Sequence, residues 1–272
     1  MKPVRLDYVR IEHAEEIFDA FEAYGADARI LAGGQSLMAM LNFRLIQPQA
    51  LVDLSRCAEL DYVRVDNGHL CIGAAATQAS VEWRTTLATE VPLLKLALPF
   101  IAHFQIRNRG TVCGSIAHAD PSAEIPLCLS TLGGEVILRS REGRRTLQAT
   151  DFFTGMLTTA IAAGEFVEEA RFPLATAGCR YAFDEVALRR GDFAIVAVAA
   201  CLSDTQITLG VGGVADRAVR KTWPRMAQAD LETALNDFAW ELGAQSDNHA
   251  SAAYRRHLVR TLGHKLLAGG LG

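Results

Sequence analysis

The stretch LAGGQSLMAMLNFRLIQPQALVDLS, residues 31–55, predicts a glycine turn and a helix between two short strands. The strands are expected over residues 29–32 and 50–54, which are short and mostly apolar. Residues 33–36 are expected to form the turn, and apolar positions at helical spacing predict a helix over residues 37–45. Backbone N–H groups at the start of a helix lack partners and favour a phosphate, so the unit predicts an anion site at its turn.

A second glycine loop lies in residues 106–126, IRNRGTVCGSIAHADPSAEIP. Its Thr111 and Ser115, like Ser36 in the first loop, add hydroxyls to backbone donors, and such loops bind phosphate without a lysine. Each loop alone is also typical of an ordinary turn, but two loops facing each other could hold the diphosphate of a dinucleotide. The chain has neither a G-x-G-x-x-G fingerprint nor a P-loop motif, so a Rossmann NAD site is disfavoured.

Composition and charge exclude several classes of protein. Half of the 272 residues are apolar and the net charge is -4, which is typical of a globular protein and gives no basic face for nucleic acid. The longest apolar run, residues 193–202, is far shorter than the roughly 20 residues of a membrane span. The N-terminus lacks the apolar core of a signal peptide, so we expect a cytoplasmic protein. The six cysteines form no C-x-x-C pair, so we expect no metal site, iron–sulfur cluster or disulfide in this chain.

The remaining pattern predicts an α+β fold in two parts. The first part includes a helix capped by Thr77 and ends with a strand at Pro173, where we expect a domain boundary. Beyond the boundary, three strands in succession are predicted over residues 181–188, 194–202 and 206–211. Two amphipathic helices follow, the first capped by Asp230 and stopped by Gly243. A small sheet followed by helices makes the second part an α+β unit.

Five stretches in the same order resemble one family, the FAD-binding medium subunits of molybdenum-containing hydroxylases. The flavoprotein subunit of aerobic carbon monoxide dehydrogenase is its type member, and the flavin domain of xanthine dehydrogenase is a more distant relative. The two glycine stretches resemble its two FAD signatures. The other three stretches are FFTGMLTT (152–159), ALRRGDFAIVAVAA (187–200) and SDNHASAAYRRHL (246–258).

The resemblance implies a particular division of the fold. Residues 1–173 are expected to form an FAD-binding domain of the type shared with vanillyl-alcohol oxidase (PCMH-type), with subdomains over about 1–55 and 56–173. Residues 174–272 are expected to form a C-terminal domain like that of the carbon monoxide dehydrogenase flavoprotein, a three-stranded antiparallel sheet with helices.

The resemblance also implies which residues bind FAD. One side of the pyrophosphate is expected to contact Arg29, Ile30, Leu31, Ala32, Gly33, Gly34, Gln35, Ser36 and Leu37. The other side is expected to contact Thr111, Val112, Cys113, Gly114 and Ser115. No histidine has a context that indicates a covalent flavin, so non-covalent FAD is expected.

The flavin end of the cofactor is expected to contact residues from both domains. Ile101 would lie against the flavin or its ribityl chain, and Val167 would line the adenine or flavin pocket. Asp120 or Glu124 would accept hydrogen bonds from ribityl or ribose hydroxyls. The segment that begins at Asp184 would approach the isoalloxazine and could gate access to it.

Cys113 departs from the family pattern, which often has glycine at this position. A cysteine has a Cβ and does not freely take positive φ. Either the position does not require the glycine conformation, or the loop is shifted slightly. The thiol itself is expected to be a small buried side chain or to lie near the cofactor.

The resemblance implies an electron-transfer subunit with no catalytic acid, base or nucleophile of its own. A large molybdopterin subunit would hydroxylate the substrate, and a small subunit with [2Fe-2S] clusters would pass electrons to the FAD of this chain. The acceptor could be NAD, quinone, cytochrome or oxygen, in a dimer of heterotrimers. Two alternatives stay open: a self-sufficient flavin oxidase, for which the chain is small, and a flavin-free scaffold subunit.

Overall fold

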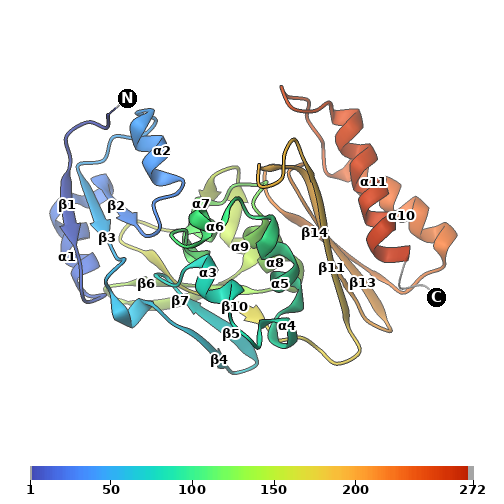
Figure 1. The fold of residues 1–272 in the computed structure, drawn as a ribbon, viewed down its shortest axis with the longest axis horizontal. Coiled ribbons are helices and arrows are strands. Elements are labelled where there is room, and N and C mark those ends of the chain that lie inside the picture. The colour runs from blue at the N-terminus through green and yellow to red at the C-terminus, as the bar shows by residue number, and fades with distance from the viewer. Residues whose placement is uncertain (1, 269–272) are drawn as a thin grey trace.

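A computed structural model describes residues 2–268 of the chain. The chain runs from a three-stranded sheet through a five-stranded sheet to a four-stranded sheet, each with its own helices (Figure 1). Within the described residues, none of the helices combines the length and the apolar character needed to cross a membrane.

The N-terminal sheet is parallel and has the strand order β1-β3-β2. Its elements are β1 (Asp7–Arg10), α1 (Glu16–Tyr24), β2 (Ala28–Leu31), α2 (Leu37–Asn42) and β3 (Ala50–Asp53), with a 3-10 turn, η1 (Gly25–Asp27). The central strand β3 has neighbours on both sides and is buried throughout. The predicted strand–loop–helix–strand unit is therefore confirmed as β2–α2–β3, with the first glycine loop between β2 and α2.

The central sheet is antiparallel, with the strand order β4-β5-β10-β6-β7. Its strands are β4 (Val63–Asp66), β5 (His69–Gly73), β6 (Glu135–Ser140), β7 (Gly143–Gln148) and β10 (Phe166–Pro173). The helices of this part are α3 (Gln78–Glu82), α4 (Leu87–Glu90), α5 (Pro92–Ala97), α6 (Phe104–Arg107), α7 (Val112–His118), α8 (Glu124–Leu132) and α9 (Ala149–Phe152). Smaller elements are η2 (Ala58–Leu60), η3 (Leu98–Phe100) and the ribbon β8 (Phe153–Gly155) with β9 (Thr158–Thr159). Because α7 packs on β5 and β10, the sheet directly supports the second glycine loop.

The C-terminal sheet has four antiparallel strands, whereas the sequence predicted three. Its elements are β11 (Arg180–Ala187), β12 (Ala194–Leu202), β13 (Gln206–Gly212), β14 (Val219–Pro224), α10 (Gln228–Glu241) and α11 (Ala252–Ala268). The sequence missed β14 because Lys221, paired with Glu241, stands between Val219 and Trp223 on the half-buried face and hides the apolar alternation. The prediction that Asp230 caps α10 was wrong. The N-cap is Ala227, and Asp230 lies in the first turn.

Strand β12 separates two hydrophobic cores. Ala197 and Ala199 face the larger core, which the helices and strands of the first two sheets also form, whereas Val196 and Val198 face the core under α10 and α11. Burial on both faces explains why β12 is continuously apolar. Because the larger core extends past Pro173 into β12, the domain boundary near Pro173 stays a prediction.

Candidate cofactor site

Few internal hydrogen bonds close the first glycine loop. Gln35 Nε2 donates to Gly33 O at 2.9 Å, and Met38 N donates to Gly34 O at 3.1 Å. Gly34 has φ +72°, in the region that favours glycine. Among residues 2–268, no protein acceptor takes the N–H groups of residues 33–36, and the Ser36 side chain does not cap α2. The loop therefore presents a row of unused donors.

The second glycine loop is closed by its own helix cap. Thr111 is the N-cap of α7, and its Oγ1 accepts a hydrogen bond from Gly114 N at 2.9 Å. A Cβ added to Gly114 would lie 2.6 Å from Thr111 Oγ1, so a larger residue here would displace the Thr111 side chain. Thr111 is buried, whereas Ser115 is half-buried with its hydroxyl available.

The two loops meet at Gly33. A Cβ built on Gly33 would lie 2.5 Å from Gly110 Cα and 2.7 Å from the carbonyl carbon of Arg109, closer than side chains approach backbone. Ala32 Cβ also lies 3.9 Å from the position of a Cβ on Gly114. The structure thus brings the two loops side by side, and glycine at position 33 is what allows the approach.

A buried carboxylate lies at the end of the central strand of the N-terminal sheet. Asp53, at the end of β3, accepts hydrogen bonds from the Tyr8 hydroxyl and from Ser55 N, the latter at 2.8 Å. Burial alone would raise the pKa of Asp53, but these hydrogen bonds and the charge of Arg109 outweigh burial and lower the pKa. Asp53 was not among the predicted site residues, although it ends the strand of the first motif.

A third segment, residues 74–78, lies against the second loop. Thr77 forms an isolated antiparallel bridge with Thr111, and its side chain caps α3 by accepting from Ser80 N at 3.1 Å, as predicted. Thr77 and Thr111 thus start two helices in the same way, side by side. The shared cap pattern, a threonine three residues before the N–H that it accepts from, could have indicated this segment.

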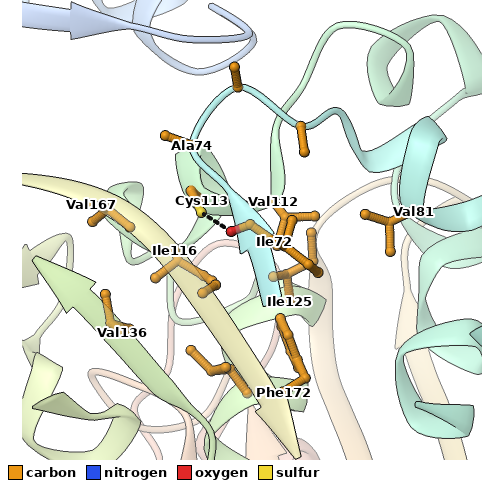
Figure 2. Packing of buried hydrophobic residues seen from close by; sticks show 14 of the residues in the cluster. Ile72, Ala74, Val81, Val112, Cys113, Ile116, Ile125, Val136, Val167 and Phe172 are labelled. Carbon is orange, nitrogen blue, oxygen red and sulfur yellow. Dashed lines mark hydrogen bonds between the residues drawn. The ribbon is translucent and has the colours of Figure 1, made fainter. Parts of the chain in front are cut away.

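Cys113 is part of the hydrophobic core. It lies inside α7 with helical backbone, is 2% exposed, and its Sγ–H donates to Ile72 O at 3.3 Å (Figure 2). Burial raises the pKa of its thiol. Position 113 therefore does not require glycine, and neither Cys113 nor the buried Val112 points its side chain out of the loop. Only their backbone is available to a cofactor.

A buried carboxyl group, Glu124, follows the second loop, and the half-buried Glu185 acts on its pKa. Glu124, the first residue of α8, is 6% exposed, and burial together with the charges of Glu185 and Asp120 raises its pKa to about 8. Burial and the charge of Asp184 raise the pKa of Glu185 to about 7. Asp120 accepts from Ser122 N at 2.8 Å. At neutral pH, Glu124 is therefore mostly protonated.

Asp184 lies on the other side of strand β11 from Glu185 and so does not point toward Glu124. It pairs across β11–β12 with Val198, on the face of the C-terminal core, and its Oδ2 lies 2.6 Å from Lys265 Nζ. The next residue, Glu185, pairs with Ala197 on the face of the larger core. Because side chains alternate along a strand, Glu185 rather than Asp184 is on the side of the larger core.

The other residues predicted to contact FAD differ in how far they are buried. Ile101 is half-buried after η3, and a Cβ added to Gly191, at the β11–β12 tip, would lie 3.0 Å from the neighbouring Ala102 O. The tip therefore closes on the Ile101 segment. Val167 is buried in β10 beside a β-bulge, among the core side chains of Figure 2, and Arg29 is exposed.

Known proteins are similar to this chain both in sequence and in fold. Residues 4–175 match the family model described as the FAD binding domain in molybdopterin dehydrogenase. The chain is 34% identical to the 6-hydroxypseudooxynicotine dehydrogenase complex subunit alpha of Paenarthrobacter nicotinovorans, over 100% of this chain and 96% of that protein. It is similar to the structure of quinoline 2-oxidoreductase from Pseudomonas putida 86, with a TM-score of 0.93, 33% identity and coverage of 100% and 98% of the two chains. Carbon monoxide dehydrogenase from Hydrogenophaga pseudoflava gives a TM-score of 0.93 at 28% identity, over 98% of each chain. The chain therefore belongs to the family of FAD-binding medium subunits of the molybdenum hydroxylases, as the resemblance of its two glycine loops predicted.

Proposed function

We propose that the chain holds FAD non-covalently between its two glycine loops and transfers electrons from a [2Fe-2S] subunit to an external acceptor. The observation that carries this proposal is the close approach of the loops at Gly33, beside the unused N–H groups of residues 33–36. Backbone donors of this kind bind phosphate oxygens without a lysine. When bound, FAD would supply the redox chemistry, and the protein would supply binding and orientation.

The diphosphate would be bound by donors from both loops. The N–H groups of residues 33–36 and the Ser36 hydroxyl would donate from one side, and the Ser115 hydroxyl would donate from the other. The Thr111 hydroxyl oxygen is already used by Gly114 N, so Thr111 would act by shaping the loop. Arg109, whose charge helps to lower the pKa of Asp53, would add a positive charge beside the phosphates.

The ribityl and flavin end would lie toward Ile101 and Glu124. A protonated Glu124 carboxyl would both donate to and accept from a ribityl or ribose hydroxyl, which a carboxylate alone would not do. The β11–β12 tip, which closes on the Ile101 segment at Gly191, would cover the flavin and control its access. These residues bind and orient, and none is proposed as an acid, base or nucleophile.

The partners proposed for this chain follow from the names of its relatives. The chain covers nearly all of proteins described as a dehydrogenase complex subunit and as a carbon monoxide dehydrogenase medium chain. We infer a large molybdopterin subunit and a small [2Fe-2S] subunit, assembled as a dimer of heterotrimers. A self-sufficient oxidase would turn over its substrate without them, so activity only in the reconstituted complex would support the subunit function.

The test is a visible spectrum of the purified chain, followed by heat denaturation and identification of the released flavin. FAD in the supernatant would support the proposal. Flavin that stays with the precipitate would contradict non-covalent binding. A colourless protein that takes up no added FAD would overturn the cofactor site and favour a scaffold subunit.

A further inference from the structure

The second glycine loop is attached to the segment before α3 by backbone bonds on both sides of Thr111. Gln78 N donates to Gly110 O at 2.7 Å, and Val112 N donates to Ala76 O at 3.3 Å. The position of the loop therefore depends on residues 74–78, which belong to neither glycine motif.

The Gln78 side chain fills the space next to Gly110. It is 6% exposed, and its Nε2 would lie 3.2 Å from a Cβ added to Gly110. The same Nε2 donates to Thr111 O at 3.5 Å, a long hydrogen bond. Gly110 also provides the Cα that a Cβ on Gly33 would approach to 2.5 Å. Gly110 is thus in contact both with the first loop and with Gln78.

The amide of Gln78 is poorly satisfied as a structural group. Its Oε1 is buried and has no hydrogen-bond partner among residues 2–268. A buried unpaired oxygen opposes folding, and an apolar side chain of the same shape would avoid this cost. Fold stability therefore does not account for a glutamine at this position, whereas contact with the cofactor loop does.

We propose that Gln78 is a positioning residue of the cofactor site, which holds Gly110 and Thr111 of the second loop in the place where the first loop closes on them. The proposal rests on the proposed FAD site between the loops. Gln78 acts through Gly110 and Thr111 and needs no contact with the cofactor. Loss of its amide lets the second loop move and weakens FAD binding, but it leaves the core packed.

The test is Gln78→Met in the full chain, because methionine has nearly the same shape and no amide. FAD is titrated into the apo-protein by flavin fluorescence, and thermal melting is followed with and without FAD. We expect a Kd for FAD at least about tenfold higher than that of the parent chain, and a smaller rise of Tm on FAD addition. The Tm of the apo-protein should change little or rise. Gln148→Met is the matched control, since Gln148 is exposed on β7 and donates to Glu135 at 2.9 Å.

Gln78→Glu adds a readout that a purely structural role would not produce. A carboxylate cannot donate to Thr111 O, but a protonated carboxyl can. Relative to the parent chain at the same pH, FAD affinity of this variant should recover as the pH falls.

The outcomes separate this proposal from the site on which it rests. Parent-like FAD affinity of Gln78→Met, with FAD bound by the parent chain, would overturn the role of Gln78 and leave the site intact. A fall in apo-protein Tm that accounts for the whole loss of affinity would also overturn it, in favour of a structural role. A parent chain that binds no FAD would overturn both.

Discussion

The two glycine loops both combine glycines with side-chain hydroxyls, but they differ in the hydrogen bonds that close them. The first loop leaves the N–H groups of residues 33–36 without protein acceptors. The second loop is closed by the Thr111 cap and is anchored to residues 74–78 and to the central sheet through α7. The first loop therefore has the features of a binding surface, whereas the second is a rigid support against which the first is set. Glycine at position 33 is what allows the two loops to approach each other closely.

The largest effect is expected where the two loops touch. Gly33→Val would force a Cβ to within 2.5 Å of Gly110 Cα, so the loops must separate. We expect FAD affinity to fall by at least about 100-fold, or about 2.7 kcal/mol, with a far-UV CD spectrum like that of the parent chain. Gly155→Val is the control, because the Cβ added there meets only Asp216 Oδ2 at 3.6 Å. Undiminished flavin content in Gly33→Val would refute the proposed contact with FAD.

Cys113→Gly tests whether the second loop is a support. We expect the free energy of unfolding to fall by about 2 kcal/mol, from lost core packing and from glycine inside a helix, without tighter FAD binding. Cys128→Gly in α8, also a fully buried cysteine, should lose a similar amount. Urea unfolding and FAD titration measure both effects. Tighter FAD binding by Cys113→Gly would mean that the cysteine distorts the loop.

The pH dependence of stability should have opposite signs at the two ends of the site. Glu124 has a pKa of about 8 in the folded chain against a usual 4.5, so the folded state binds more protons and stability falls as the pH rises between these values. Asp53 has a lowered pKa, so its contribution is present above pH 3.8 and is lost as the pH falls below that value.

Glu124→Gln isolates the first of these effects, because glutamine resembles the protonated carboxyl. We expect the free energy of unfolding of the variant to exceed that of the parent chain by a margin that grows steadily as the pH rises from 5 to 9. Urea unfolding at pH 5, 7 and 9 measures this difference, with Glu142→Gln at an exposed turn as control. An identical pH dependence in Glu124→Gln and the parent chain would contradict the buried protonated carboxyl.

The smallest effect is expected at the two helix caps. Thr111→Val and Thr77→Val should each lower the free energy of unfolding by about 1 kcal/mol, because each removes one cap hydrogen bond. Only Thr111→Val should also weaken FAD binding directly, since Thr111 shapes the second loop. Equal losses of FAD affinity in both variants would show that the two caps form one unit.

Local patterns in the sequence were sufficient for much of the fold. Apolar spacing predicted the strand–loop–helix–strand unit, and a threonine in the right place predicted the start of α3. The pattern failed at β14, where Lys221 occupies a half-buried position and its long side chain reaches Glu241. It also failed at α10, where Asp230 was taken for the cap. The failure at β14 comes from a side chain whose partner lies outside its own element.

The candidate site was predictable as loops but not as a set of contacts. The sequence singled out both glycine loops and Glu124 but not Asp53 or Gln78, because the partners of these two, Tyr8 and Gly110, are distant from them in the sequence. Asp184 was chosen where the structure places Glu185 on the side of the larger core. A shift of one residue reverses the face of a strand, and only packing decides which face is buried.

The family, the two glycine loops and many of the local turns and helices follow from the sequence alone, because these depend on residues near one another in the chain. Three features appear only in the packed chain: Gly33 closes on Gly110, Cys113 points into the core, and the charge of Glu185 acts on the pKa of Glu124. These contacts join segments far apart in the chain, and their geometry is set by how sheets and helices pack around a shared core, which no local pattern records.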